Sequence, residues 1–248
     1  MLFTTSTLSL VLALAPTTLF AAPTRTTELI DSIANIFPRQ NIPAGILSQL
    51  AQTNSLCDLS NIVLPIAPTP LAPITPGLTL RHIAIGRGTQ NYTCTSSSAL
   101  DTPKPTGAIA TLFNATCDAA RLPTNVLADI TKLALNYAIP SATGAQQRVS
   151  GHHEFTAAGV PLFNLVTPNA DLGYVLAKPD AVKSSAPVGA AAGANGLGSV
   201  AWLKLSAVEG DYKEVYRVHT AGGVAPKNCD GVDGGFTVEY SAQYWFYA

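Results

Sequence analysis

Alternating apolar and polar positions run through the C-terminal two thirds of the chain and predict a protein built mainly from β-strands. In residues 236–247 the apolar series begins with Phe236, Val238 and Tyr240, and polar residues such as Thr237 stand between its members. A period of two places alternate side chains on opposite faces of a sheet, so this segment is expected to be a strand. Similar strands are expected at residues 108–113, 152–155, 161–166, 173–177, 200–205 and 212–219.

Residues 78–95 are expected to form two more strands on either side of a turn. Two glycines, Gly86 and Gly88, stand in the middle of this segment, and clustered glycines are typical of turns. In the second of these strands, alternation places Cys94 on the inner face and Asn91 on the outer face.

One helix interrupts the series of strands. The apolar residues of segment 126–137 recur at helical spacing, and Thr124 or Asn125 stands before them as a helix cap. Many strands with one internal helix predict a mainly β single domain, either a β-sandwich or a barrel. A doubly wound sheet would need a helix after nearly every strand.

The first 21 residues are expected to be a secretory signal peptide. Residues 8–21 form an apolar run that is too short to span a bilayer and that ends in small residues. Cleavage after Ala21 or Ala22 would leave a mature chain in which no stretch approaches 18 uninterrupted apolar residues, so no membrane span is expected.

Two further segments precede the strands. Residues 22–54 are expected to form a helical N-terminal arm, because Leu29, Ile33 and Phe37 recur at helical spacing. Residues 64–77 contain five prolines, which exclude a helix or a central strand. This proline-rich segment is expected to be an extended connector over the body of a β domain that spans residues 55–248.

Cysteines and glycosylation motifs agree with secretion. The four cysteines are Cys57, Cys94, Cys117 and Cys229. An even number in an oxidising compartment predicts two disulfides, and the sequence leaves all three pairings open. Two N-glycosylation motifs begin at Asn91 and Asn114.

The charge of the chain excludes several classes of partner. Charged residues make up 12% of the sequence and the formal net charge is −1. The lysines and arginines are scattered rather than clustered, so a surface for nucleic acid or for anionic lipid is not expected.

Residues 196–201 fit the GxGxxA pattern of dinucleotide-binding loops, but their flanks do not. Such a loop needs a strand before the glycines and a helix after them, whose N-terminus faces the phosphates. Here a low-complexity stretch precedes the glycines and a β-like segment follows them. We therefore expect a mobile surface loop at residues 184–198, and no NAD or other cofactor.

The strongest candidate for catalytic or metal chemistry is the pair His152 and Glu154. On a strand these two residues share a face, so a metal site would combine them with His82 or His219 from neighbouring strands. The HExxH and GxSxG motifs are absent, and a histidine on a strand is more often a hydrogen-bonded structural residue.

Aromatic residues on the C-terminal strands favour ligand binding instead. Trp202, Tyr216 and Trp245 lie on three predicted strands, and flat rings on a sheet can form a platform for sugar rings, although core packing is the commoner role. Trp245 belongs to the polar face of its strand, so its exposure would be informative. Arg217 could anchor an anionic or hydroxylated ligand, or form a structural ion pair.

Four segments together resemble a known family. They are HIAIGRGTQNYTC (82–94), GSVAWLKL (198–205), VYRVHTAGGVAP (215–226) with a cysteine after it, and VEYSAQYWFYA (238–248). In this order they resemble the DUF3455 family, a family of unknown function common in secreted fungal proteins and also found in bacteria, over about residues 55–248. Members are frequently labelled malate dehydrogenase, but the resemblance implies only a domain identity and an extracellular setting, with no catalytic residues.

These observations predict a secreted extracellular or cell-wall protein that has no cofactor. Its expected role is to bind a cell-wall glycan or a small apolar ligand, or to serve as a structural component. The alternative is an extracellular hydrolase or metal-dependent enzyme centred on His152 and Glu154.

Overall fold

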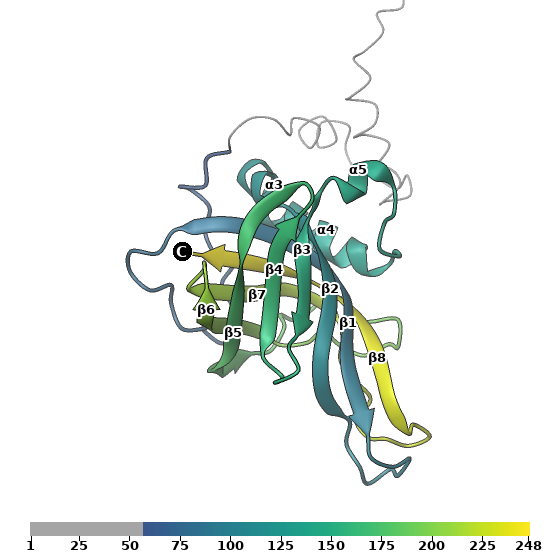
Figure 1. Cartoon of the computed structure of the whole chain (residues 1–248). Helices are drawn as coiled ribbons and strands as arrows, with labels where there is room; N and C mark the ends of the chain where they lie inside the picture. Colours follow the sequence, from purple (N-terminus) through teal and green to yellow (C-terminus); the bar gives the residue numbers. More distant parts are fainter. Residues whose placement is uncertain (1–56) are drawn as a thin grey trace, which may run out of the picture.

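Eight antiparallel strands close into a barrel in the computed structural model, which describes residues 57–248 (Figure 1). The strands are β1 (Leu80–Cys94), β2 (Lys104–Asn114), β3 (Val149–Phe155), β4 (Pro161–Thr167), β5 (Ala170–Ser184), β6 (Trp202–Gly210), β7 (Glu214–Gly222) and β8 (Gly234–Tyr247). Each strand pairs with the next in sequence, and β8 returns to pair with β1. The mainly β prediction is confirmed, and the barrel rather than the sandwich is the correct form. The expected signal peptide (1–21) and N-terminal arm (22–54) lie outside the described residues.

The predicted turn at Gly86 and Gly88 is wrong, because β1 runs through both glycines while pairing with β2 and β8. A Cβ atom at Gly88 would lie 1.9 Å from the carbonyl oxygen of Ile109, and one at Gly86 would lie 2.6 Å from the ring of Tyr244. The glycines therefore mark positions where the barrel leaves no room for a side chain. The sequence pattern alone does not distinguish such positions from a turn.

Inward-facing side chains fill the barrel and form the first of two cores. This interior core consists of Ala84, Ala108, Ala110, Leu112, Phe163, Leu165, Val175, Ala177, Leu203, Leu205, Tyr212, Val215, Tyr240, Ala242, Tyr244 and Phe246. An eight-stranded barrel is just wide enough for side chains to fill or for one small ligand. Alanines on β1, β2 and β8 therefore leave space for the large rings on β4 and β8.

Three helices connect β2 to β3 and gather on one side of the barrel (Figure 1). They are α3 (Thr116–Arg121), α4 (Thr124–Leu135) and α5 (Thr143–Gln146). The predicted helix is α4, but its N-cap is Pro123 rather than Thr124 or Asn125. The expectation of a single internal helix is wrong, because α3 and α5 are too short to show a periodic pattern in the sequence.

Polar contacts fix α4 on the outer face of the barrel. Ser241 Oγ donates to the carbonyl oxygen of Thr131 at 2.6 Å, and Gln243 Nε2 donates to Thr131 Oγ1 at 3.1 Å. At the end of the helix, Arg87 Nε donates to the carbonyl oxygen of Ala134 at 3.0 Å. A cation at a helix C-terminus also interacts favourably with the helix dipole. These bonds place α4 across β8, where it forms one wall of the site described below.

The proline-rich segment 64–77 forms neither helix nor strand, and it packs against outward-facing residues of β6 and β7. Lys204 Nζ donates to the carbonyl oxygen of Pro73 at 2.8 Å and pairs with Glu214 Oε1 at 2.7 Å. Burial alone would raise the pKa of Glu214, but bonds from Lys204 and Thr75 outweigh it and hold that pKa below its usual value. The prediction of a connector lying over the body is confirmed.

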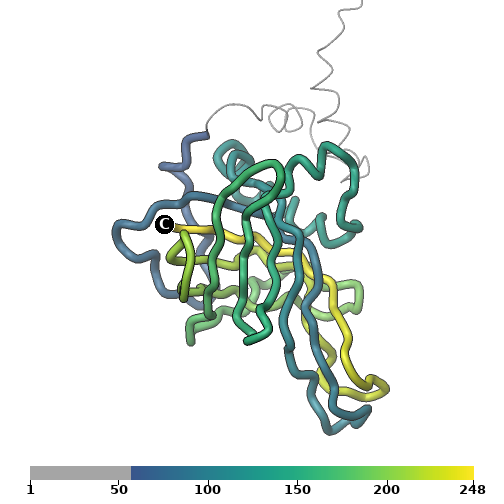
Figure 2. The backbone as a smooth tube through the Cα atoms, viewed as in Figure 1, coloured from purple at the N-terminus to yellow at the C-terminus, as the bar shows by residue number. Residues whose placement is uncertain are grey.

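Two disulfides link distant parts of the chain, as the cysteine count predicts. Cys57 pairs with Cys117 of α3, and Cys94 at the end of β1 pairs with Cys229 in the β7–β8 connection. Figure 2 shows β1, β2 and β8 extending together beyond the barrel body to this second tether. The bridges join residues 60 and 135 positions apart, so each is expected to stabilise the fold by on the order of 4 kcal/mol. In the part of the chain that the structure describes, no helix is long and apolar enough to cross a membrane.

Removing one member of the buried Lys204 and Glu214 pair is expected to cost more than removing both. Glu214→Gln leaves a buried ammonium without its counter-ion and should lower the free energy of unfolding by about 3 kcal/mol. The double variant Lys204→Met with Glu214→Leu should lose clearly less, because no charge is left unpaired. Urea unfolding of the three proteins measures both values. Equal losses in the single and double variants would contradict this account.

Candidate functional site

A pocket of about 260 Å³ lies on the outer face of the barrel, between α4 and the β5–β6 connection. It is lined by Asn125, Ala128, Asp129, Lys132, Pro187, Val188, Gly189, Ala190, Trp202, His219 and Thr220. Two of these residues, Trp202 and His219, are among the candidates that the sequence singles out. The structure brings them together from the start of β6 and the end of β7, with ring centroids 4.9 Å apart and an edge-to-face geometry.

The position of His219 depends on an irregularity in β7. The pairing register with β8 shifts between Val218 and Ala221, and His219 has a φ of 48°. It is the sole residue other than glycine with a positive φ among residues 57–248. Histidine tolerates this conformation better than most residues, but the conformation still has a cost, and such positions cluster at functional sites. The irregularity turns the imidazole toward Trp202.

The two rings present polar atoms that no protein group satisfies. Trp202 Nε1 and His219 Nε2 are both buried, and neither has a hydrogen-bond partner in the described chain. Leaving a buried polar atom unpaired costs about 1 to 3 kcal/mol, so such atoms need an explanation. A bound molecule that accepts a hydrogen bond from Trp202 and bonds His219 would remove this cost.

Charged groups from α4 stand at the rim of the pocket. Asp129 and Lys132 form an ion pair at 3.0 Å, with side chains 61% and 43% exposed. Burial lowers the pKa of His219 from 6.5 to about 4, Lys132 lowers it further and Asp129 opposes the shift. The imidazole is therefore neutral at neutral pH, and the charges at the rim compensate each other.

The other aromatic candidates do not form an exposed platform. Trp245 is 2% exposed and Tyr216 is fully buried, and both pack beneath α4 or the proline-rich segment. Trp245 Nε1 donates to Gln243 Oε1 at 3.0 Å, and the hydroxyl of Tyr216 donates to the carbonyl oxygen of Ala72 at 2.9 Å. A sugar ring cannot stack on these two side chains while the outer cover is in place.

The structure does not assemble the histidine cluster considered for metal. His152 and Glu154 are exposed on the outer face of β3. His82 is buried, with its ring nitrogens 2.9 Å from Thr116 Oγ1 and 3.0 Å from Ser150 Oγ. Within residues 57–248, no group of three or more His, Cys, Asp or Glu side chains is placed to hold a metal ion. His82 is therefore a hydrogen-bonded structural residue.

Sequence reasoning passes over His153, which lies inside the barrel. Its ring stacks on Phe163 with centroids 4.2 Å apart, and its Nδ1 bonds the carbonyl oxygen of Leu162 at 2.9 Å. The available signal is that His153 alternates with Gly151 and Phe155, whereas His152 alternates with polar residues.

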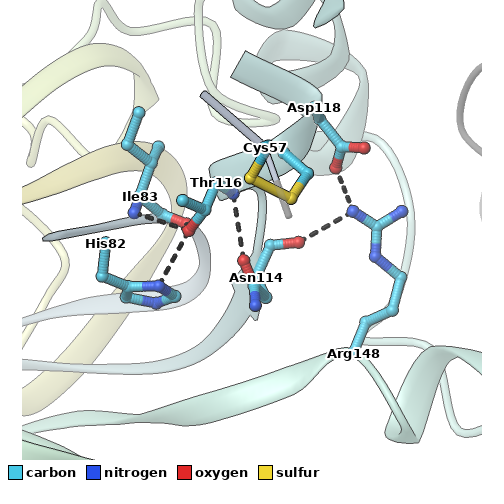
Figure 3. Close-up of a disulfide and its surroundings, with 8 residues drawn as sticks. Cys57, His82, Ile83, Asn114, Thr116, Asp118 and Arg148 are labelled. Carbon is cyan, nitrogen blue, oxygen red and sulfur yellow. Dashed lines mark hydrogen bonds and ion pairs between the residues drawn. A yellow bond between two sulfur atoms is a disulfide. The ribbon is translucent and has the colours of Figure 1, made fainter. Parts of the chain in front are cut away.

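The two glycosylation motifs differ in exposure. Asn114 is exposed beside the Cys57–Cys117 disulfide, and its Oδ1 accepts the backbone N–H of Thr116 at 3.0 Å (Figure 3). Asn91 is half-buried on β1, and its Oδ1 accepts the Thr89 hydroxyl at 3.0 Å. The amide nitrogen that would carry a sugar takes part in neither bond.

The glycine-rich segment before β6 does not have the geometry of a dinucleotide loop. A strand follows it instead of a helix, because β6 begins at Trp202. The segment is bonded to the end of β7 and to the β7–β8 connection. Gly222 N–H, at the end of β7, donates to the carbonyl oxygen of Ala191 at 2.9 Å, and Asn195 Nδ2 donates to the carbonyl oxygen of Val224 at 2.9 Å. Its role in the fold is to hold one wall of the pocket over β7.

Comparison with known proteins gives a family without a function. The model of a family described as "Protein of unknown function (DUF3455)" matches residues 74–248. Neither the curated proteins nor the solved structures compared with the chain give a match. The comparisons therefore assign no chemistry to the pocket.

Stability is expected to fall as the pH decreases from about 6.5 to about 4. Burial lowers the pKa values of His82, His153 and His219 from 6.5 to about 4 in the folded chain. In this window the unfolded chain binds protons that the folded chain does not, so the stabilisation present above pH 6.5 is progressively lost.

Urea unfolding at pH 7.5, 6 and 5 measures this effect. His219→Gln should reduce the slope between pH 7.5 and 5, because it removes one of the three buried imidazoles whose pKa is lowered by folding. Equal slopes in the wild type and the His219→Gln variant would show that His219 does not contribute.

Proposed function

The chain belongs to the DUF3455 family, and we propose that it is a secreted protein. It binds a small ligand in the pocket between α4, β6 and β7. The observation that carries this proposal is the pair of buried, unpartnered ring nitrogens of Trp202 and His219. Both line a pocket large enough for a small organic molecule.

The lining indicates the class of ligand. Ala128, Pro187 and Val188 supply apolar walls, while Trp202 can only donate a hydrogen bond and a neutral His219 can donate or accept one. Drug-sized ligands occupy pockets of about 300 to 1,000 Å³, so the present volume suits a smaller molecule. A single sugar unit of a cell-wall glycan has an apolar face for these walls and hydroxyl groups that can bond the two ring nitrogens. A small apolar alcohol also combines an apolar body with a hydroxyl group.

An extracellular location agrees with several features. The disulfides Cys57–Cys117 and Cys94–Cys229 are typical of oxidising compartments. The signal peptide at residues 1–21 and sugars on Asn91 and Asn114 are part of the proposal. The DUF3455-like domain at 55–248 would then be the part that meets the ligand outside the cell.

Binding is favoured over catalysis by the groups that line the pocket. No serine or cysteine is among its lining residues, and the hydroxyl of Thr220 is engaged with the carbonyl oxygen of Val200 at 2.6 Å. The lining therefore offers no free hydroxyl or thiol nucleophile, and its two charged side chains, Asp129 and Lys132, are held in an ion pair.

Tryptophan fluorescence provides a direct test, because the chain has two tryptophans and Trp202 alone lines the pocket. In a Trp245→Phe protein, emission comes from Trp202. Addition of a ligand from a panel of monosaccharides, short chitin and β-glucan oligomers and small alcohols should shift this emission and raise the melting temperature. His219→Gln should weaken binding about tenfold, or about 1.4 kcal/mol.

A pocket-filling variant is the matched control. Ala190→Phe places a ring in the pocket and should abolish the emission shift, whereas the exposed substitution Val208→Thr should not. If no member of the panel shifted the emission at about 10 mM, or if Ala190→Phe bound as well as the wild type, the proposal would be wrong.

A further inference from the structure

The polar residues of α4 that line the pocket stand on one face of the helix. Asn125, Asp129 and Lys132 follow one another at separations of four and three positions, at which helical side chains are neighbours. At the rise of an α-helix, about 1.5 Å per residue, this row is about 10 Å long. Its amide, carboxylate and ammonium groups offer both donors and acceptors of hydrogen bonds along one wall of the pocket.

The groups of this row are accessible to a ligand. Asn125 is exposed, and the side chains of Asp129 and Lys132 are 61% and 43% exposed. Their ion pair joins Lys132 Nζ to Asp129 Oδ1 at 3.0 Å. Because an ammonium has three N–H groups and a carboxylate has two oxygens, both residues can bond hydroxyl groups of a ligand while the pair stays intact.

The wall formed by the β5–β6 connection carries no polar side chain. It consists of Pro187, Val188, Gly189 and Ala190, in a turn in which the N–H of Ala190 donates to the carbonyl oxygen of Pro187 at 3.0 Å. A ligand that fits between this turn and α4 therefore needs one apolar face and one polar edge.

A second set of polar atoms lies deeper in the pocket. Trp202 Nε1 and His219 Nε2 are buried and have no hydrogen-bond partner in the described chain, unlike the solvent-exposed row on α4. A ligand with one hydroxyl group can bond the buried nitrogens or the row on α4. A ring that carries several hydroxyl groups can bond both, so the two sets of polar atoms favour a ligand of this kind.

The charges around the pocket favour a neutral ligand. Asp129 would repel a carboxylate and Lys132 would repel a cation, and the two compensate each other. Burial lowers the pKa of His219 to about 4, so its imidazole adds no charge at neutral pH.

We propose that the ligand is a neutral pyranose ring with several hydroxyl groups, and that Asn125, Asp129 and Lys132 select it over an apolar alcohol. This inference rests on the function proposed above and narrows its ligand class. One hydroxyl group bonds the buried ring nitrogens, others bond the row on α4, and the apolar face of the sugar ring lies against Pro187 and Val188.

Calorimetric titration of the full-length protein tests this inference. The ligands are the methyl glycosides of glucose, mannose and N-acetylglucosamine, with cyclohexanol as a six-membered ring that carries a single hydroxyl group. At least one glycoside should bind tenfold or more tightly than cyclohexanol, because it alone can bond both sets of polar atoms.

Variants of α4 separate the two sets of polar atoms. Asp129→Ala and Lys132→Ala should each weaken glycoside binding about tenfold and leave cyclohexanol binding unchanged, whereas His219→Gln should weaken both. Exposed ion pairs contribute little to stability, so both α4 variants should keep the circular dichroism of the wild type. Glu154→Ala, at an exposed position of β3, is the control that should change neither affinity.

The outcomes distinguish this inference from the function on which it rests. If cyclohexanol bound as tightly as every glycoside, or if both α4 variants bound the glycosides like the wild type, the inference would be overturned and the pocket would remain a binding site for small alcohols. If none of the four compounds bound at about 10 mM, the proposed function would fail together with the inference.

Discussion

Pairing of the first strand with the last is the interaction on which the other features depend. β1 and β8 run antiparallel from Leu80 opposite Tyr247 to Cys94 opposite Gly234. This ladder closes the barrel, removes its free edges and divides every strand into an inward and an outward face. Gly86 and Gly88 permit the closure, because the Tyr244 ring and the neighbouring backbone occupy the space that side chains would need.

The outer face of the barrel carries a buried core of its own, although the outer face of such a sheet could have been exposed to water. A second cluster of buried residues, which includes Ile83, Trp202, Tyr216 and Trp245, lies outside the barrel. α4 and the proline-rich segment cover it, and they are held by hydrogen bonds to Thr131, Pro73 and Ala72. The pocket at Trp202 and His219 lies where this cover is incomplete.

The backbone beside the pocket also holds a charged side chain of the barrel interior. The Ala201 carbonyl that holds Arg217 belongs to the residue immediately before Trp202, and Arg217 is two residues before His219 on β7. Alternation along the strands sends Arg217 inward and Trp202 outward. A single pair of strands thus presents a fixed guanidinium to the barrel interior and two unpartnered ring nitrogens to its exterior.

The local sequence pattern was sufficient to predict much of the fold but little of the candidate site. Alternation predicted seven of the strands, helical spacing predicted α4, the prolines predicted the connector, and the cysteine count predicted two disulfides, because each of these follows from neighbours in sequence. The turn predicted within β1 does not exist, and the error arose because a glycine that makes room for a distant tyrosine has the same local signal as a glycine in a turn.

The sequence by itself therefore determined which residues share a strand face, and the tertiary structure decided what each face meets. Trp245 lies on the polar side of β8, yet it is buried because α4 and the proline-rich segment cover that side. His152 and His153 are the same residue type at adjacent positions of β3, but only the side chain of His153 lies inside the barrel. Closure, disulfide pairing, and the meeting of Trp202 with His219 all arise from contacts between residues far apart in the chain, which no period of two or 3.6 encodes.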